Sequence, residues 1–459
     1  MLKVFNPSDS TLIAELKSDT PEIIALKVRM AKKAQPAWKA TSISERIKTI
    51  SKFKELLQSQ KNDLAKLLTL EVGKPIRQSR NEIDGAIGRI DFFIENVEAT
   101  LRDQEVFRDP TTGFREVISR DPLGVIANIS AWNYPYLVGV NVFVPALLAG
   151  NAVLYKPSEF ASLTGLKITD LLHKSGISES VFSPVIGDGK VGSEILNQNI
   201  DGVFFTGSYK TGLAISNALA SKLIKVQLEL GGKDPVYVTD NVDAKTAAAS
   251  IADGTFYNNG QGCCSIERIY VHEKIYDNFL THFLSEVASF KVGLPEDEET
   301  YLGPLTRKAH LEYLKEQVND ALKKGARLEM GGGKMKDFSD YYFEPTVLTN
   351  VNHSMDLMNE ETFGPVIGIQ KVSSDENALS LMMDTSYGLT AGVYCRDERR
   401  SRKILEQVDS GTSYWNCCDR VSPRLPWAGR NHSGLGLTLG TEGILTFTKS
   451  RSWHLRPQS

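Results

Sequence analysis

Short apolar segments alternate with amphipathic segments through the middle of the chain, and this alternation limits the folds that the chain can adopt. The apolar runs predict strands, and the segments between them predict helices. We expect strands at 124–130, 151–157, 181–187, 203–207 and 225–232, and helices at 161–175, 190–198 and 209–221. This order is typical of a mostly parallel sheet with helices on both faces.

A second set of strands and helices begins near Pro235 and continues to about residue 430, with its clearest helices at 273–290 and 306–325. At 459 residues, 41% of them hydrophobic, the chain is long enough for two large lobes. We therefore expect an α/β protein with two lobes and a ligand cleft between them.

The first part of the chain predicts helices followed by a hairpin. Residues 42–72 are expected to form one long amphipathic helix, which begins with capping-box spacing at Ser42 and Glu45. A second helix is predicted at 78–100. The segment 104–120 alternates polar and apolar residues around a Pro-Thr-Thr-Gly turn, as in a β-hairpin.

Charge and hydropathy argue against several classes of partner. The chain has 53 basic and 56 acidic residues, so nothing in its charge favours nucleic acid or an anionic membrane. The longest apolar stretch, 134–150, is shorter than the roughly 20 residues that cross a bilayer. The first residues also lack the apolar core of an export signal. We expect a cytoplasmic enzyme with no membrane or nucleic-acid partner.

The cysteines are expected to be reduced thiols. Neighbouring cysteines do not easily form a disulfide, and a chain of this size does not need one. No CxxC occurs and the seven histidines are scattered, so we expect no metal site. The five cysteines are Cys263, Cys264, Cys395, Cys417 and Cys418.

Two of these thiols lie in the segment FYNNGQGCCSIER (256–268), directly after a Gly-Gln-Gly sequence. A glycine-rich backbone allows a substrate to approach closely, and a thiol there can act as a nucleophile once its pKa is lowered. The alternative is that Cys263 and Cys264 are small buried apolar residues.

Two further polar residues occupy unusual positions. Glu229 stands in an apolar strand, where burial would raise its pKa and suit it to be a general base, unless it serves as a structural ion-pair partner. Asn133 follows a strand and precedes a Pro turn, where its amide could donate to an oxyanion or simply form the turn.

Further motifs occur in order along the chain, namely KPSE (156–159), FTGSYKTG (205–212), EETFGPV (360–366) and PWAGRNHSGLG (426–436). With the three features above, they make the sequence resemble the NAD(P)-dependent aldehyde dehydrogenase superfamily from about residue 5 to the end. The resemblance implies an aldehyde dehydrogenase-like α/β fold, with two Rossmann-like α/β lobes and a small β oligomerisation element. It places the NAD-binding domain at 1–103 and 123–230, the catalytic domain at 231–432, and the oligomerisation hairpin and tail at 104–122 and 433–459.

The resemblance also implies roles for the reactive residues. Cys263 matches the nucleophile, Glu229 the general base and Asn133 the oxyanion donor, which would act together with the backbone N–H of Cys263. The implied reaction passes through a thiohemiacetal and a thioester, and water activated by Glu229 then releases the carboxylic acid. The role of Cys264 stays open.

Cofactor residues follow from the same resemblance. In the KPSE motif, Lys156, Ser158 and Glu159 would hold the adenosine ribose, and a carboxylate there favours NAD over NADP. The pyrophosphate would meet Ser208 at a helix N-terminus, whereas GDGKVG (187–192), although a literal GxGxxG, is expected to be mainly a turn near the adenine. The remaining expected cofactor residues are Trp132, Gly207, Gly212, Leu230, Glu361 and Phe363.

The chain departs from many hydrolytic members at two positions. Val142 stands where they carry a Lys, and Thr438 stands where they carry a Glu. In the family those two residues can form a proton exit from the general base. We therefore expect Glu229 to release its proton by another path, such as bulk water.

The aldehyde tunnel is expected to be lined by Tyr134, Val138, Asn141, Val421 and Trp427. Small or polar residues at 141 and 421 imply a wide tunnel and a longer or more polar substrate. Arg420 and Arg424 could bind a substrate carboxylate. Alternatively, Asp419 with Tyr134 and Trp427 could bind an ammonium group.

Two other functions remain open on the same fold. One is a CoA-acylating aldehyde dehydrogenase, against which the intact Glu229 argues. The other is a non-catalytic binding or structural protein, which the intact set of Cys263, Glu229 and Asn133 disfavours. The hairpin and tail resemble oligomerisation elements, so a homodimer or homotetramer is expected.

Overall fold

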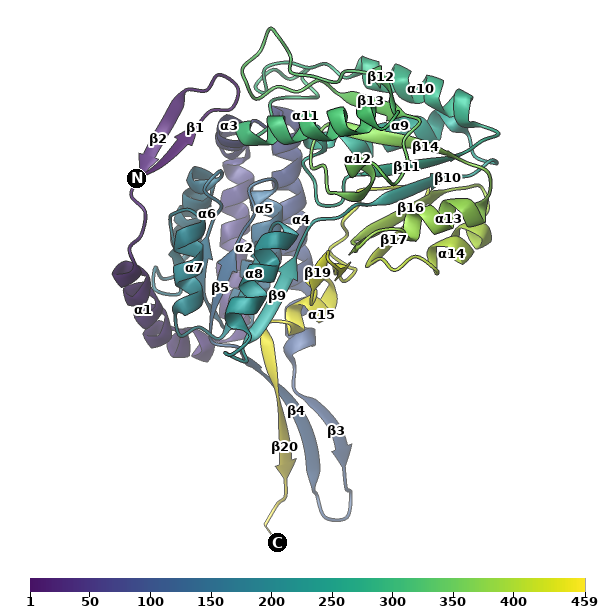
Figure 1. Ribbon diagram of the computed structural model, residues 1–459. Coiled ribbons are helices and arrows are strands. Elements are labelled where there is room, and N and C mark those ends of the chain that lie inside the picture. The colour runs from purple at the N-terminus through teal and green to yellow at the C-terminus, as the bar shows by residue number, and fades with distance from the viewer. Residues whose placement is uncertain (459) are drawn as a thin grey trace.

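The computed structural model describes residues 1–458, and it has the mixed α/β fold that the sequence predicts (Figure 1). The first lobe is built on a six-stranded sheet in the order β19-β9-β8-β5-β6-β7, in which β19 alone is antiparallel. Its strands are β5 (Val125–Ile129), β6 (Ala152–Lys156), β7 (Phe182–Pro184), β8 (Gly202–Thr206), β9 (Lys225–Glu229) and β19 (Gly434–Leu435).

Helices cover both faces of this sheet. Apolar side chains of α2 to α6 pack against one face, and those of α1, α7 and α8 pack against the other. The helices are α1 (Pro21–Ala40), α2 (Ile43–Ser59), α3 (Lys61–Val72), α4 (Ile76–Leu101), α5 (Pro135–Leu148), α6 (Ser162–Ser175), α7 (Gly189–Asn197) and α8 (Tyr209–Leu219).

The single helix predicted at 42–72 is wrong, because the chain breaks at Gln60 into α2 and α3. The backbone of Gln60 has φ −108° and ψ 12°, outside the helical range. The break lets Leu64 of α3 join the core cluster that also contains Leu57 of α2. The predicted capping box is confirmed, since Ser42 and Glu45 bond to each other's backbone N–H.

The second lobe contains a seven-stranded sheet in the order β12-β13-β14-β11-β10-β16-β17, with β12 antiparallel. Its strands are β10 (Pro235–Val238), β11 (Arg268–His272), β12 (Arg327–Met330), β13 (Thr346–Thr349), β14 (Val366–Val372), β16 (Thr390–Tyr394) and β17 (Thr412–Trp415). Its helices are α9 (Ala244–Phe256), the 3₁₀ turn η1 (Tyr257–Gly260), α10 (Tyr276–Ser289), α11 (Lys308–Lys323), α12 (Asp356–Asn359), α13 (Asp375–Met383) and α14 (Glu398–Leu405).

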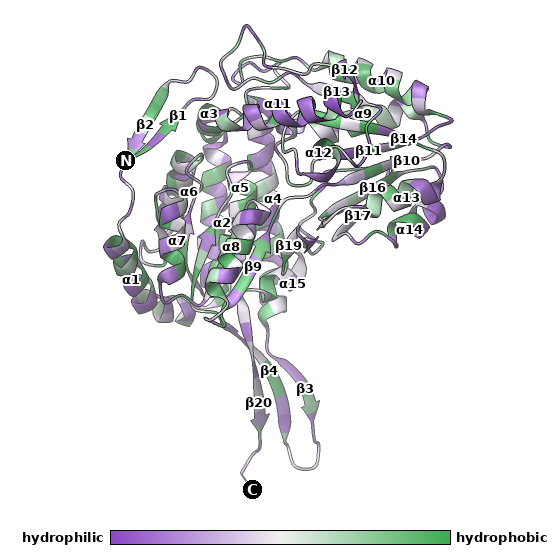
Figure 2. Cartoon of the chain, viewed as in Figure 1, coloured by the Kyte–Doolittle hydropathy of each residue, from purple (hydrophilic) through white to green (hydrophobic). Residues whose placement is uncertain are grey.

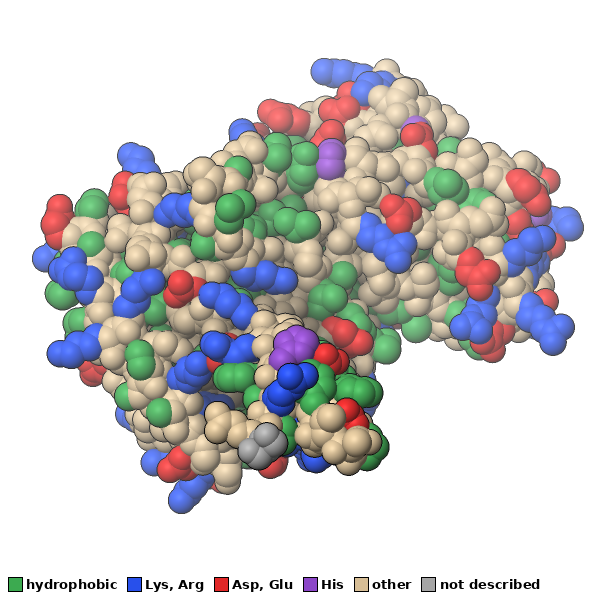
Figure 3. Space-filling view, turned by 90° about the horizontal axis from the view of Figure 1, so that it is seen from below, with side chains coloured by type: hydrophobic (Ala, Val, Ile, Leu, Met, Phe, Trp, Pro, Cys, Tyr) green, Lys and Arg blue, Asp and Glu red, His purple; other side chains and the backbone are tan. Residues whose placement is uncertain are grey.

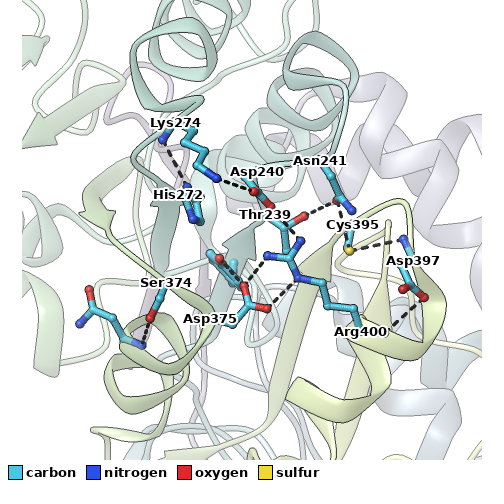
Figure 4. Close-up of polar contacts among 12 residues, drawn as sticks. Thr239, Asp240, Asn241, His272, Lys274, Ser374, Asp375, Cys395, Asp397 and Arg400 are labelled. Carbon is cyan, nitrogen blue, oxygen red and sulfur yellow. Dashed lines mark hydrogen bonds and ion pairs between the residues drawn. The ribbon is translucent and has the colours of Figure 1, made fainter.

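A polar network ties the helices of this lobe to the end of strand β10. Arg400 of α14 donates to both carboxylate oxygens of Asp375, at 2.6 and 2.7 Å, and to Asp240 at 2.8 Å (Figure 4). Lys274 also reaches Asp240, at 3.4 Å. The network therefore links α13, α14 and the loop after β10.

A three-stranded antiparallel sheet projects from the body (Figure 1). It is formed by β3 (Gln104–Arg108), β4 (Arg115–Pro122) and β20 (Thr448–Leu455), so the predicted hairpin is confirmed. Most residues of these three strands are hydrophilic, whereas a buried strand such as β5 of the first lobe is mostly hydrophobic (Figure 2). Seen from below, hydrophobic side chains gather among charged ones around this projection (Figure 3).

Small elements complete the structure. The short helix α15 (Gly440–Leu445) packs against α4, so only the last part of the expected tail joins the projecting sheet. Two-stranded sheets are formed by β1 (Leu2–Phe5) with β2 (Leu12–Leu16) and by β15 (Tyr387–Gly388) with β18 (Arg430–Asn431). Within residues 1–458, no helix has the length and hydropathy needed to cross a bilayer.

Candidate active site

A cavity of about 1890 Å³ lies where the carboxyl ends of β5, β6, β8 and β9 meet the second lobe. It is larger than the roughly 300–1,000 Å³ of most small-molecule pockets, so it has room for a dinucleotide and a substrate. All the site residues expected from the sequence line it, except Gly212. Gly212 lies in the first turn of α8, where an added Cβ would come within 2.6 Å of Leu230 Cδ2.

Cys263 lies in the loop between η1 and β11, half-buried at the cavity wall. Two consecutive left-handed residues, Asn258 (φ 54°) and Asn259 (φ 58°), bend the backbone just before this loop. The adjacent Cys264 hydrogen-bonds to Cys263, and that bond and burial raise the pKa of the Cys264 thiol well above its usual value. A raised pKa reduces the reactivity of the Cys264 thiol.

Asn133 is buried and joined to the cysteine loop. Its side-chain Nδ2 donates to the backbone carbonyl of Gln261 at 3.0 Å. The backbone carbonyl of Asn133 accepts from Lys74 Nζ at 2.6 Å. Lys74 forms a fully buried ion pair with Glu82, whose other oxygen accepts from the Tyr136 N–H at the start of α5. These contacts fix Asn133 relative to Cys263.

Glu229 ends strand β9 and is 6% exposed. Burial raises the pKa of its carboxyl to about 7, although hydrogen bonds from Thr438 and Gln227 and the charge of Arg89 act in the opposite direction. The Thr438 hydroxyl donates directly to Glu229 Oε1, and Gln227 Nε2 donates to the same oxygen at 3.2 Å. A carboxyl with this pKa can both accept and release a proton near neutral pH.

Arg89, on α4, was not predicted as a site residue, although it lines the same cavity. Its Nη1 donates to Asn141 Oδ1 at 2.8 Å and to the Leu137 carbonyl at 3.1 Å. The sequence carried a signal for it, because Arg89 lies seven residues after Glu82 on the buried side of the predicted helix. A charge on a buried helix face marks a functional or paired group.

The cavity beside β6 and β8 offers the features that a dinucleotide requires. Lys156 and Glu159 approach each other to 3.9 Å, and Ser158 donates to Glu159 at 3.4 Å. Ser208 caps α8, whose first turn faces the cavity with its N–H groups, as in anion-binding helix ends. An added Cβ would collide with Phe205 at Gly207 and with Glu361 at Gly231, so only glycine fits at these two positions. These residues fit a nicotinamide dinucleotide.

Glu361 and Phe363 are held by a buried network that was not predicted from the sequence. Lys233 pairs with Glu267 at 2.6 Å and donates to Thr362 at 2.9 Å, and Glu267 accepts from the Phe363 N–H at 2.9 Å. Glu361 accepts from the Gly232 N–H at 3.3 Å, and burial raises its pKa to about 8. The Phe363 ring packs edge-on against Trp132, with centroids 5.6 Å apart.

The five residues expected to line the tunnel, Tyr134, Val138, Asn141, Val421 and Trp427, all line the cavity on the cysteine side. Lys74 Nζ lies 3.7 Å from the centre of the Tyr134 ring. Arg420 and Arg424 are exposed at the rim, and Asp419 Oδ1 is buried without a hydrogen-bond partner among residues 1–458. Burial raises the pKa of Asp419 to about 6.

One α/β cleft therefore contains a thiol, a buried carboxyl and residues that fit a dinucleotide. This combination is typical of a cofactor-dependent oxidoreductase that forms a covalent intermediate. The sequence profile of the aldehyde dehydrogenase family matches residues 1–453. The chain belongs to this family and is an enzyme.

Curated relatives and a solved structure are similar to this chain over nearly its whole length. Aminoaldehyde dehydrogenase 1 of Malus domestica is 32% identical, with 96% of this chain and 90% of the relative covered. Betaine aldehyde dehydrogenase 1 of Rhizobium meliloti is 33% identical, with 97% and 92% covered. The structure of PnpE in complex with nicotinamide adenine dinucleotide is similar at a TM-score of 0.95, with 32% identity and coverage of 99% of this chain and 94% of PnpE.

Proposed function

We propose that this aldehyde dehydrogenase oxidises a polar aldehyde to the carboxylic acid with NAD, using Cys263 as nucleophile, Glu229 as general base and Asn133 as oxyanion donor. One observation carries the proposal: these three side chains line a single cavity together with the residues that fit a dinucleotide.

The first half of the reaction forms the covalent intermediate. The Cys263 thiolate attacks the carbonyl carbon, and the carbonyl oxygen takes up the negative charge. The Asn133 amide and the backbone N–H of Cys263 donate to that oxygen, and loss of such a donor costs about 3 to 4 kcal/mol in the transition state. NAD held at Lys156, Glu159 and Ser208 would supply the hydride acceptor, and loss of a hydride from the substrate carbon would leave a thioester on Cys263.

The second half releases the acid. Glu229 takes a proton from a water molecule, the resulting hydroxide attacks the thioester carbon, and the C–S bond breaks to regenerate the thiol. The pKa of about 7 leaves a large fraction of Glu229 ionised at neutral pH, as this step requires. A general base of this kind supports water, rather than CoA, as the acyl acceptor.

The cofactor preference rests on Glu159. Its carboxylate lies beside Lys156 at the end of β6, where it would accept from the ribose hydroxyls and repel a 2′-phosphate. This arrangement favours NAD over NADP.

The projecting sheet supports a homo-oligomer. Strand β3 is exposed along its whole length, and Val106 and Phe107 are each about half exposed. An exposed strand edge with apolar side chains is a surface for pairing with a second copy.

All five cysteines are free, as in a reducing compartment such as the cytoplasm.

The test is NADH formation from a panel of aldehydes in the absence of CoA, with identification of the carbon product. The proposal expects stoichiometric NADH and carboxylic acid with NAD, and much less NADPH with NADP. A strict requirement for CoA, or no reduction of either cofactor by any aldehyde, would contradict it.

A further inference from the structure

We propose that Arg89 binds the distal carboxylate of the substrate, so that the preferred aldehyde is a semialdehyde carrying a carboxylate at its other end. This inference rests on the proposed function of the same cavity. It concerns a residue that no motif of the sequence pointed to.

The guanidinium of Arg89 is buried and forms no direct ion pair with a carboxylate of residues 1–458. The residue is 7% exposed, and no carboxylate of residues 1–458 approaches it within 4.0 Å. Buried charges in proteins are normally paired, because an isolated ion loses its hydration without compensation. A cation that lines a ligand cavity and has no direct carboxylate partner in the protein is placed to receive an anionic ligand group.

The neighbouring carboxylates are already engaged elsewhere. Glu82 pairs with Lys74 and accepts from the Tyr136 N–H. Glu229 accepts from Thr438 and Gln227. Burial lowers the pKa of Arg89 only to about 10, so the group keeps its charge at neutral pH.

The free donors of Arg89 suit a carboxylate. Nη1 donates hydrogen bonds to Asn141 and to the Leu137 carbonyl. Nε and Nη2 have no hydrogen-bond partner among the described residues. Those two nitrogens form the edge of the guanidinium that binds a carboxylate through two parallel hydrogen bonds. The bond to Asn141 fixes the side chain against α5, which limits the entropy lost on binding.

The cavity provides space for the ligand, since Arg89 and the preceding Gly88 both line it. Apart from its chain neighbours and the backbone of its own helix, Gly88 has no atom within 4 Å of the position where a Cβ would stand. Cys263 lines the same cavity, so one extended molecule can reach both residues.

Arg89 is a better carboxylate receptor than the arginines of the rim. The side chain of Arg420 is 73% exposed and Arg424 is also exposed, so water screens both charges. The rival arrangement is an ammonium group at Asp419. Burial raises the pKa of that carboxyl to about 6, and Arg420 lies 3.9 Å away, which weakens its attraction for a cation.

The test compares three aldehydes of equal length with NAD: succinate semialdehyde, 4-aminobutanal and butanal. Wild-type enzyme should prefer succinate semialdehyde over butanal in kcat/KM. In Arg89→Met this preference should fall by about 100-fold, the effect of losing a two-bond carboxylate contact. Arg89→Lys should restore part of it, and Arg424→Met, a matched change at the rim, should keep it.

Two outcomes would overturn the inference. One is an equal loss of kcat/KM for all three aldehydes in Arg89→Met, which would show that Arg89 acts on Glu229 and not on the substrate carboxylate. The other is a preference of the wild type for 4-aminobutanal, which would assign the substrate to Asp419.

A binding measurement separates this inference from the proposed function. Calorimetry with succinate and the NAD-loaded enzyme requires no turnover. Succinate should bind the wild type and Arg424→Met but not Arg89→Met, even if no aldehyde is oxidised. Equal binding to all three proteins would refute the inference while leaving the oxidation itself intact.

Discussion

At the scale of single residues, the proposed role of Glu229 as general base predicts how the reaction depends on pH. Its pKa is raised to about 7 by burial, so below pH 7 the carboxyl is protonated and cannot accept a proton from water. The rate of thioester hydrolysis should therefore fall about tenfold for each pH unit below about 6 and level off above 8. Single-turnover measurements of acid release between pH 5 and 9 check this profile, and a rate independent of pH would contradict the role of Glu229.

Thr438 should tune that profile. Its hydroxyl donates to Glu229 and lowers the pKa of the carboxyl. Thr438→Val removes the donor, so the acidic limb of the profile should move to higher pH by about half a unit to one unit. Thr441→Val, an exposed change three residues along the chain, is the control and should leave the limb in place. An unshifted limb in Thr438→Val would show that the hydroxyl does not act on the carboxyl.

Sequence alone identified the candidate catalytic residues but not their surroundings. Cys263 and Glu229 stand in local motifs, which a single segment of sequence displays. Arg89 acts through contacts with residues about fifty positions away, and the Lys233–Glu267 pair depends on the meeting of two strand ends. No spacing within one segment reveals such contacts, although the buried helix face marked Arg89 itself as unusual.

At the scale of elements, the predicted strands and helices of both lobes lie close to the observed ones, because apolar runs and amphipathic periods are local signals. The break at Gln60 was missed. The apolar face continues from Leu57 to Leu64 with helical spacing, so the sequence gives no sign of the turn that tertiary packing imposes.

The network around Arg400 should hold α13 and α14 on the second sheet. Arg400→Met would leave Asp375 and Asp240 without their shared partner, and the loss should cost about 2 kcal/mol of stability. The midpoint of thermal unfolding should fall by several degrees. Arg402→Met, an exposed change on the same helix, should leave it unchanged. Equal midpoints for both variants would show that the network contributes no net stability.

At the scale of the whole molecule, the proposed homo-oligomer depends on the projecting sheet. The chain has a mass of 50.8 kDa, and light scattering should give a multiple of it. Charge placed on the exposed strand, as in Val106→Lys with Phe107→Glu, should shift the protein toward the single-chain mass, because burial of these charges would oppose pairing. Leu223→Lys, at a leucine 95% exposed in the first lobe, is the control. A wild-type mass of one chain would contradict the proposed assembly.

The cavity is lined by residues of both lobes, and the central claim of the proposal is that the thiol of Cys263 is the nucleophile there. The most direct test is the burst of NADH on mixing enzyme, NAD and aldehyde, compared between Cys263→Ser and its neighbour control Cys264→Ser. Cys263→Ser should lose the burst and turnover, because a serine hydroxyl stays protonated and is a far weaker nucleophile. Cys264→Ser should retain both. A full burst in Cys263→Ser would contradict the account.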